Sequence, residues 1–352
     1  MSTSHSSRLP EGSTILVTGV TGYIGSWVAN EALSLGYKVR GAVRSLDKAA
    51  WLQAHFDSSF GPGQYSQALL TNVSDKAGFE AAIKGVAGII HVAVNTELSP
   101  DPEPYIPQNI EETLGVLNAA QAEASVKSVV FTSTSMAGVA WGAKGSIPKD
   151  AYNEEFIAKA WDKSFGHPAK HFFVYAAAKA QAEKAAWKFM QDKKPHFALN
   201  TILPNANFGP SLVYQKQGHP STGAWPKALY DGDVSMIKGF PPQYFIDVRD
   251  CAKLHVAALV DPETSNERLW GFAEPFNWND LLAIYRKVWP EKKFIDDLEN
   301  LGVDESILDT TGALKALQNV FGQSAWTSLE TTIREAGYDK EAIEGNAKKL
   351  SL

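Results

Sequence analysis

The sequence predicts an α/β fold in which helices cover both faces of a doubly wound parallel sheet, with a second, smaller domain. Short β-branched runs alternate with helical apolar patterns from about residue 13 to residue 205, an order typical of βαβ units. A glycine-rich turn joins the first strand to the first helix. After Pro204 the chain becomes rich in Gly, Pro, Asn and aromatic residues, which favours loops around a pocket.

The elements of the first domain follow one another in regular order. The patterns predict strands at 13–19, 37–43, 65–71, 87–94, 128–134 and 197–205. They predict helices from the glycine turn to Gly36, at 45–56, 76–85, 110–124 and around Tyr175. A short strand and helix at 243–260 should return to the sheet, and helical stretches such as 278–289 end the chain. We therefore expect a first domain over 12–204, rejoined by about 243–262, and a second over 205–242 and 263–350.

Composition argues against two classes of partner. The 352 residues carry a net charge of −6 with both signs interspersed, whereas a nucleic-acid site needs clustered Lys and Arg. The sequence has no apolar run of the ~20 residues that a membrane span requires. Cys251 is the only cysteine, which excludes an intramolecular disulfide and fits a reducing, cytoplasmic location.

Three glycines lie three residues apart between the first strand and the first helix. Because glycine carries no Cβ, backbone amides at the start of the helix can approach a pyrophosphate. Their place in a strand–turn–helix unit predicts a dinucleotide cofactor. The predicted contacts in this turn are Gly19, Thr21, Gly22, Tyr23, Ile24 and Gly25.

The end of the second strand distinguishes the two nicotinamide cofactors. An acidic residue there would accept hydrogen bonds from an unphosphorylated ribose, and the sequence KVRGAVRS places none at that turn. Arg44, Ser45 and Lys48 instead offer the positive charge and donors that a 2′-phosphate needs. Arg40 is a second, less suitable arginine. We therefore expect NADPH.

Tyr175 and Lys179 lie four residues apart in a helical segment. This spacing places both side chains on one face, about 6 Å apart along the axis. A free phenol has a pKa near 10, and a nearby ammonium favours the phenolate. We therefore expect Lys179 to lower the pKa of Tyr175 and make it a better acid–base group.

Hydroxyl side chains follow the fifth strand, in the sequence FTSTS. Ligands of open parallel sheets bind at the carboxyl ends of the strands, where a hydroxyl can donate to a carbonyl oxygen that gains negative charge. Ser133 is a candidate for this role, and Thr134 and Ser135 are close alternatives.

The GxxGxxG turn and the distant Tyr-Ala-Ala-Ala-Lys resemble the extended short-chain dehydrogenases/reductases. Within that superfamily the chain is similar to the yeast and fungal NADPH-dependent aldehyde reductases, which have broad carbonyl reductase activity and are relatives of dihydroflavonol reductase. The likeness is carried by VYAAAKAQAEKAAWKFMQDKKPHFALNTILPN, VRGAVRS, PPQYF and GAWP. The long segment between Ser133 and Tyr175 also favours this branch over the sugar-nucleotide epimerases.

The resemblance implies a Rossmann fold and a role for several residues. Ser133 aligns with the catalytic serine, Tyr175 delivers the proton, and Lys179 hydrogen-bonds the nicotinamide ribose. Asn109 matches an asparagine that holds a proton-relay water, although an N-cap role suits it equally. The resemblance implies further cofactor contacts at Asn72, Val73, Ala93, Pro204 and Asn205.

Aromatic and apolar side chains of the second domain are candidates for the substrate wall, because such linings bind neutral, bulky aldehydes and ketones. For each of them, packing in the domain core is an equal alternative. No arginine occurs between Pro204 and Asp247, which argues against a sugar nucleotide as substrate. The candidates are Phe208, Trp225, Phe240 and Gln243.

The sequence thus predicts an NADPH-dependent reductase of small-molecule carbonyl compounds, including aromatic ketones and keto esters. A regulatory protein that senses NADP without catalysis is one alternative, but such proteins lack the Tyr and Lys pair. A nucleotide-sugar epimerase or dehydratase is the other, and would need an acid near residue 44. His167 and His171 lie four apart with no accompanying acid or thiolate, so we expect no metal.

Overall fold

The large sheet of the computed structural model is parallel throughout. The structure describes residues 7–71, 76–94 and 98–339. Within these residues seven strands form the sheet, in the spatial order β10 (Arg268–Gly271), β7 (Ala198–Pro204), β5 (Ser128–Thr132), β4 (Gly88–His91), β1 (Thr14–Thr18), β2 (Lys38–Val43) and β3 (Tyr65–Leu69). The chain runs outward from β1 in one direction and then from β4 in the other, so the order reverses between them. The predicted Rossmann fold is confirmed.

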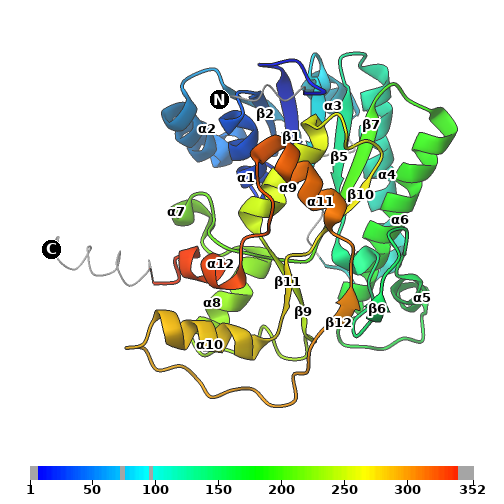
Figure 1. The fold of residues 1–352 in the computed structure, drawn as a ribbon. Helices are drawn as coiled ribbons and strands as arrows, with labels where there is room; N and C mark the ends of the chain where they lie inside the picture. Colours follow the sequence, from blue (N-terminus) through cyan, green and yellow to red (C-terminus); the bar gives the residue numbers. More distant parts are fainter. Residues whose placement is uncertain (1–6, 72–75, 95–97, 340–352) are drawn as a thin grey trace.

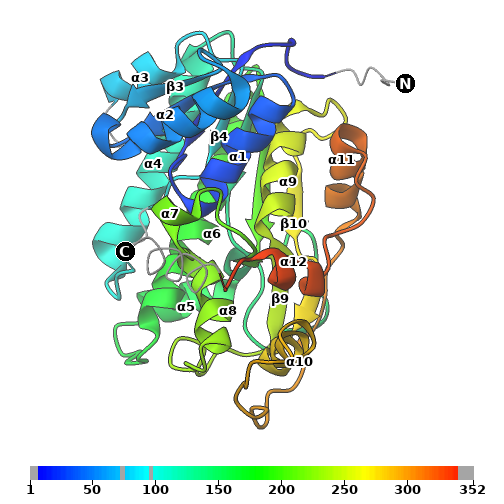
Figure 2. The same ribbon diagram turned by 90° about the vertical axis from the view of Figure 1, so that its left-hand side faces the viewer.

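Helices cover both faces of this sheet (Figure 1, and turned by 90° in Figure 2). One face packs against α1 (Tyr23–Ser34), α2 (Leu46–Phe60), α9 (Val248–Val260) and α11 (Thr311–Phe321). The other face packs against α3 (Lys76–Ile83), α4 (Pro102–Ala122) and α6 (Lys170–Lys193). Side-chain caps start several of these helices: Ser45 accepts a hydrogen bond from the Lys48 amide, and Asp247 accepts one from the Arg249 amide.

A smaller unit adjoins the carboxyl edge of the large sheet and has an aromatic core. Its three-stranded sheet contains β8 (Ala206–Phe208), β9 (Gln243–Asp247) and β11 (Glu274–Phe276). Helices α8 (Ala224–Tyr230), α10 (Trp278–Val288) and α12 (Leu329–Glu335) pack around it. In Figure 1 this unit lies below the large sheet.

One predicted strand lies in a different sheet from the one expected, and one strand of the large sheet was not predicted. Residues 243–247 were expected to return to the large sheet, but β9 pairs with β8 and β11, where the Phe245 ring contacts those of Phe208 and Phe276. Strand β10, from the segment assigned to the second domain, pairs with β7 and forms the edge of the large sheet. Helix α9 does return to the large sheet, as expected.

The long segment between β5 and α6 is folded and is tied to the C-terminal part of the chain. It contains α5 (Glu154–Trp161) and β6 (Lys144–Ser146), which pairs with β12 (Glu305–Ile307). The remaining short elements are α7 (Tyr214–Gln217) and two 3₁₀ turns at Ser135–Ala137 and Ser221–Gly223.

Helix α4 begins at Pro102, eight residues before the predicted start. Asp101 accepts a hydrogen bond from the Glu103 amide and so caps the helix, and proline suits the first helical position. Pro107 lies inside the helix, where proline usually ends one. Asn109 is therefore an interior residue of α4 and not an N-cap.

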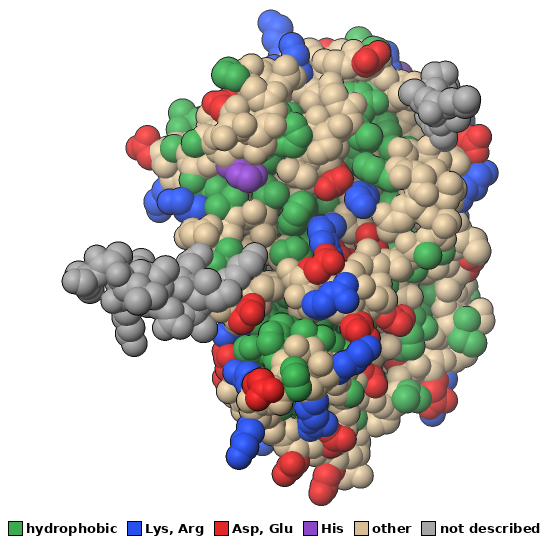
Figure 3. All heavy atoms as spheres, turned by 60° about the vertical axis from the view of Figure 1, so that its left-hand side comes forward, with side chains coloured by type: hydrophobic (Ala, Val, Ile, Leu, Met, Phe, Trp, Pro, Cys, Tyr) green, Lys and Arg blue, Asp and Glu red, His purple; other side chains and the backbone are tan. Residues whose placement is uncertain are grey.

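The surface carries charges of both signs. Figure 3 shows acidic and basic side chains interspersed on the face that it draws, with no broad area of one sign. No helix within the described residues is long and apolar enough to cross a lipid bilayer.

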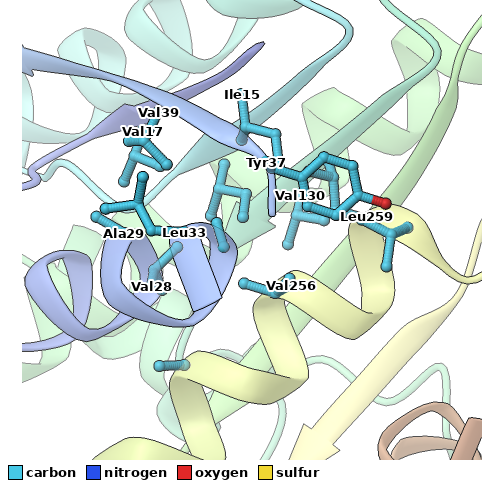
Figure 4. Packing of buried hydrophobic residues seen from close by; sticks show 14 of the residues in the cluster. Ile15, Val17, Val28, Ala29, Leu33, Tyr37, Val39, Val130, Val256 and Leu259 are labelled. Carbon is cyan, nitrogen blue, oxygen red and sulfur yellow. The ribbon is translucent and has the colours of Figure 1, made fainter. Parts of the chain in front are cut away.

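The core on the first face is made by α1 and α9 packing against the middle of the sheet (Figure 4). Figure 4 labels Ile15, Val17, Val39 and Val130 from the strands, Val28, Ala29 and Leu33 from α1, Tyr37 from the turn before β2, and Val256 and Leu259 from α9. All of them are buried. Full burial of a large aliphatic side chain stabilises the fold by about 1.5–3 kcal/mol, so the approach of α1 to the sheet is a major source of stability.

Replacing Gly25 by alanine should push α1 away from the sheet. A Cβ there would lie 2.2 Å from the Gly19 carbonyl oxygen, and a backbone atom cannot move aside. We expect the free energy of unfolding to fall by about 2 kcal/mol, measured by denaturant titration.

Gly115→Ala in α4 is the matched control. A Cβ on Gly115 would meet no atom within 4 Å, and alanine stabilises a helix interior by about 0.5–1 kcal/mol relative to glycine. Equal stability of the two variants would contradict the packing argument.

Candidate functional site

The carboxyl ends of five parallel strands bring most of the predicted site residues to one edge of the large sheet. Strands β1, β2, β4, β5 and β7 all end there. Helix α6, which carries Tyr175, contacts the 3₁₀ turn that follows β5. The residues that follow these strand ends are Gly19, Arg44, Ala93, Ser133, Thr134 and Asn205.

The glycine turn has the geometry of an anion site. Gly19 has a φ of 66°, a left-handed conformation that favours glycine, and a Cβ on it would lie 2.9 Å from the Ala93 nitrogen. Helix α1 follows Gly22 and has no side-chain cap. An uncapped helix N-terminus beside side-chain-free backbone fits a pyrophosphate group. The residues present therefore suit a dinucleotide.

The side chains of Tyr23 and Ile24 face the protein. The Tyr23 hydroxyl donates to the Gly209 carbonyl oxygen at 2.7 Å, and Ile24 packs against the core. These two residues would therefore meet a cofactor through their backbone amides. The Gln217 side chain donates to the Thr21 carbonyl oxygen at 3.3 Å, a contact of the turn that sequence reasoning missed.

Two cations follow β2 at the same edge. Arg44 and Lys48 are exposed, and the Ser45 hydroxyl between them accepts a hydrogen bond from the Lys48 amide. Arg40 points elsewhere, because it donates to the Ala82 carbonyl oxygen at 2.7 Å near the end of α3. The three residues predicted to meet a 2′-phosphate, Arg44, Ser45 and Lys48, thus lie together at this edge.

The other predicted cofactor contacts lie at the ends of β4 and β7 or outside the described residues. The Ala93 amide donates to Thr18 Oγ1 at 3.1 Å, which holds the end of β4 against β1. Pro204 ends β7, and the Asn205 amide donates to the carbonyl oxygen of Gly271. Asn72 and Val73 lie outside the described residues.

Helix α6 carries Tyr175 and Lys179 on one face. The Lys179 side chain is buried, with its Nζ 4.3 Å from the centroid of the Phe131 ring. The alanines at 176–178 are buried against Tyr105 and Ile106 of α4. Their small size therefore lets α6 approach α4 closely.

The pKa values of the two residues differ from the expected pattern. Burial raises the pKa of Tyr175, although a side-chain hydrogen bond with Thr134 opposes this effect. The pKa of this phenol is therefore raised and not lowered as expected, and burial is the largest influence on it. Burial lowers the pKa of Lys179 to about 8, and the carboxylates of Glu183 and Glu112 oppose that shift. A neutral phenol beside an ammonium suits a proton donor at neutral pH.

Two neighbouring hydroxyls after β5 have different partners. Ser133 Oγ donates to the buried carboxylate of Glu183 at 2.7 Å, whereas Thr134 hydrogen-bonds Tyr175. Successive side chains of an extended chain point to opposite sides, and Thr134 is extended, with φ −155° and ψ 152°. The structure therefore corrects the choice of Ser133 as the hydroxyl beside the phenol: that hydroxyl belongs to Thr134, and Ser135 begins the following 3₁₀ turn.

Asn109 is buried inside α4, and its amide nitrogen donates to the Tyr105 carbonyl oxygen at 2.7 Å. The phenol of Tyr105 interacts electrostatically with Tyr175. Helix α4 thus contributes a second tyrosine to the surroundings of Tyr175. Sequence reasoning missed Tyr105 because Pro107, which usually ends a helix, led to a predicted helix start after it.

Trp225 and Phe240 belong to an aromatic group beside α6. The Phe240 ring centroid lies 4.7 Å from that of Trp225, 5.4 Å from Phe172 and 6.1 Å from Trp141. Phe172 precedes Tyr175 by three residues and so lies on the same face of α6. Sequence reasoning missed Trp141 and Phe172, although the three-residue spacing of Phe172 was a usable signal.

The other two predicted substrate residues have different surroundings. Phe208 is fully buried and stacks on Phe245, with ring centroids 6.0 Å apart, and it meets Phe276 edge to face at 5.1 Å. It is therefore a core residue of the second unit and not a pocket wall. Gln243 begins β9, and its buried amide nitrogen has no hydrogen-bond partner among the described residues.

A hollow of about 370 Å³ lies at a different place, lined by Tyr152, Trp187 and Arg268 among others. Trp187 follows Tyr175 by twelve residues on α6, which is about 18 Å along the helix axis. The hollow is therefore separate from the candidate active site.

Comparison with known proteins agrees with this geometry. Residues 15–270 match the NAD dependent epimerase/dehydratase family. The chain is 38% identical over 338 residues to aldehyde reductase 2 of Sporidiobolus salmonicolor, with 93% of this chain and 96% of that protein covered. It is 36% identical over 329 residues to the NAD-dependent epimerase/dehydratase terH of Aspergillus terreus, with coverages of 92% and 96%.

Among solved structures, Gre2 from Candida albicans in complex with NADPH superposes with a TM-score of 0.79 at 24% identity, over 96% of this chain and 99% of that one. At that identity the likeness concerns the fold. The family match and the relatives confirm the superfamily expected from the glycine turn and the Tyr and Lys pair. The chain belongs to the NAD dependent epimerase/dehydratase family, the extended short-chain dehydrogenases/reductases.

Proposed function

We propose that the protein reduces aldehydes and ketones to alcohols with NADPH. The observation that carries the proposal is the neutral phenol of Tyr175, hydrogen-bonded to Thr134 and close to the buried Lys179. The 38% identity to a protein named aldehyde reductase supports the reaction class. Aromatic ketones and keto esters are included because the aromatic group beside α6 suits neutral, bulky substrates.

In this proposal, Thr134 and Tyr175 hold the carbonyl oxygen through their hydroxyl groups. Bound NADPH supplies the hydride to the carbonyl carbon. Tyr175 gives its proton to the oxygen, and the ammonium of Lys179 stabilises the resulting phenolate. Asn109, fixed by its hydrogen bond to the backbone of Tyr105, is proposed to hold a water that returns the proton.

The proposed cofactor site runs along the carboxyl edge of the sheet. The amides of the glycine turn would meet the pyrophosphate, and Arg44, Ser45 and Lys48 would meet the 2′-phosphate. The complex of Gre2 with NADPH, which shares the fold, supports this choice of cofactor. The cytoplasmic location stays a prediction.

A nucleotide-sugar epimerase or dehydratase is less well supported, although one relative carries such a name. A sugar nucleotide needs a clamp for its diphosphate, and no arginine occurs between Pro204 and Asp247. A protein that senses NADP without catalysis would have no use for the arrangement of Tyr175 and Lys179.

Tyr175→Phe should abolish reduction, because it removes the proton donor and leaves the ring in place. We expect kcat with an aromatic aldehyde to fall by at least about 100-fold, while NADPH binding followed by cofactor fluorescence is retained. Tyr37→Phe is the control, since its hydroxyl bonds Ser7 at the opposite edge of the sheet. Undiminished turnover in Tyr175→Phe would exclude the proposed mechanism.

Thr134→Val should lower kcat more than Ser133→Ala does. A hydrogen bond to developing charge contributes about 1.5–3 kcal/mol, which corresponds to a loss of roughly 10- to 100-fold in kcat for Thr134→Val. Steady-state kinetics on both variants test this order. The reverse order would restore Ser133 as the oxygen-binding hydroxyl.

Arg44→Ala should raise the KM for NADPH by about tenfold, the size expected for one charged hydrogen bond, and leave the KM for NADH unchanged. Lys38→Ala is the control, because Lys38 is an exposed cation at the other end of β2. An unmodified protein that prefers NADH would contradict this assignment.

A further inference from the structure

Glu183 is a fully buried carboxylate on the face of α6 that carries Tyr175 and Lys179. The three residues follow one another at intervals of four, so they form one row along the helix. Glu183 is 0% exposed. A buried charge is costly unless it is well paired, and the mechanism above gives Glu183 no role.

The carboxylate of Glu183 accepts hydrogen bonds from three strands. Its Oε1 accepts from Thr201 Oγ1 at 2.9 Å and from Arg268 Nε at 2.7 Å. Its Oε2 accepts from Ser133 Oγ at 2.7 Å and from Arg268 Nη2 at 3.4 Å. Because these donors belong to or directly follow β5, β7 and β10, Glu183 joins three adjacent strands to the helix that bears Tyr175.

Through Ser133, the carboxylate fixes the residue that follows β5. The Ser133 amide donates to the Ile202 carbonyl oxygen at 2.7 Å, and its hydroxyl donates to Glu183, so both backbone and side chain are held. The next residue, Thr134, is extended and directs its side chain to the opposite side, where it bonds Tyr175. Any displacement of Ser133 would therefore move the Thr134 hydroxyl.

Glu183 also acts on the charge of Lys179. Lys179 faces Glu112 from α4, His91 from β4 and the Phe131 ring from β5. Burial lowers the pKa of His91 to about 3, so this side chain is neutral at pH 7 and adds no charge. Glu183 opposes the burial-induced lowering of the Lys179 pKa more strongly than Glu112 does. Without the charge of Glu183, Lys179 would lose its proton at a lower pH.

We propose that Glu183 is a positioning residue for the reduction proposed above: it holds the Thr134 hydroxyl in place through Ser133 and keeps Lys179 charged. The inference rests on the proposed function. An ion pair with Arg268 that served only to hold the fold together would affect stability, and would leave the pH dependence of the reaction unchanged.

Two substitutions at Glu183 separate its two actions. Glu183→Gln keeps the length of the side chain and removes its charge. In the pH profile of kcat/KM, the alkaline limb is expected near pH 8 from the pKa of Lys179. In Glu183→Gln this limb should move to lower pH by about one unit. Glu183→Asp keeps the charge and shortens the side chain, so it should lower kcat and leave that limb in place.

Glu112→Gln is the matched control for charge. Glu112 acts on Lys179 from α4 but hydrogen-bonds Gln108 and not Ser133. It should move the alkaline limb in the same direction by less, with little change in kcat at lower pH.

A second variant deals with loss of stability. Glu183→Gln leaves Arg268 buried without its carboxylate, which should lower the melting temperature. Combining it with Arg268→Met removes the unpaired charge, so the double variant should regain stability. Its alkaline limb should stay at a lower pH than in the unmodified protein, but the shift should be smaller than in Glu183→Gln because a cation has also been removed. NADPH affinity, followed by cofactor fluorescence over the same pH range, gives a readout that needs no turnover, because Lys179 is proposed to bind the ribose.

The proposal is overturned if the alkaline limb lies at the same pH in the unmodified protein and in the folded double variant, both for kcat/KM and for NADPH affinity. If the unmodified protein binds NADPH but reduces no carbonyl compound, the proposed function fails. In that case the pH dependence of NADPH affinity still decides the role of Glu183: a downward shift in Glu183→Gln supports it, and an unmoved curve rejects it.

Discussion

The close contact between helices α4 and α6 is the constraint on which the candidate site depends. The alanines at 176–178 are buried against Tyr105 and Ile106, and larger side chains in a packed core force their neighbours apart. Four residues of an α-helix span about 6 Å along its axis, so Tyr175, Lys179 and Glu183 have fixed spacings on α6. The distance of α6 from the sheet therefore determines the contacts of all three residues. Tyr175 meets Thr134, Lys179 meets Phe131, and Glu183 meets its donors on the strands. A displacement of the helix would therefore disturb the contacts of Tyr175, Lys179 and Glu183 together.

The proposed cofactor side and the proposed substrate side of the candidate site are held by different interactions. On the cofactor side, backbone geometry in the glycine turn and hydrogen bonds such as that of Ala93 to Thr18 fix the strand ends. On the substrate side, contacts between aromatic rings predominate: Phe208 is buried in the core of the second unit, and the ring centroids of Trp225 and Phe240 lie 4.7 Å apart. Backbone hydrogen bonds hold one geometry, whereas ring contacts are less directional and can accept substrates of different shape.

Periodicity and turn chemistry were enough to predict the order of strands and helices, because buried parallel strands and amphipathic helices leave strong patterns. They were not enough where one sequence pattern is compatible with two different structures. Ser133 and Thr134 are adjacent hydroxyls on an extended chain, so only the partners in space decide which one meets Tyr175. The segments of β9 and β10 are both short apolar runs, and the choice of which one pairs with β7 depends on tertiary packing. Glu183 could have been found from the sequence, since it continues the four-residue spacing of Tyr175 and Lys179.

Strand β10 and helix α11 come late in the chain, yet Leu269 and Leu317 belong to the same core as the first strand and helix. During synthesis the large sheet therefore cannot complete its core when residue 205 leaves the ribosome. Roughly 110 further residues must follow, which takes about 6–22 s at ordinary elongation rates. Until then β7 lacks its outer neighbour, and an unpaired strand edge beside exposed apolar surface invites aggregation or chaperone binding. The topology thus places the nascent chain's greatest risk of misfolding before its release from the ribosome.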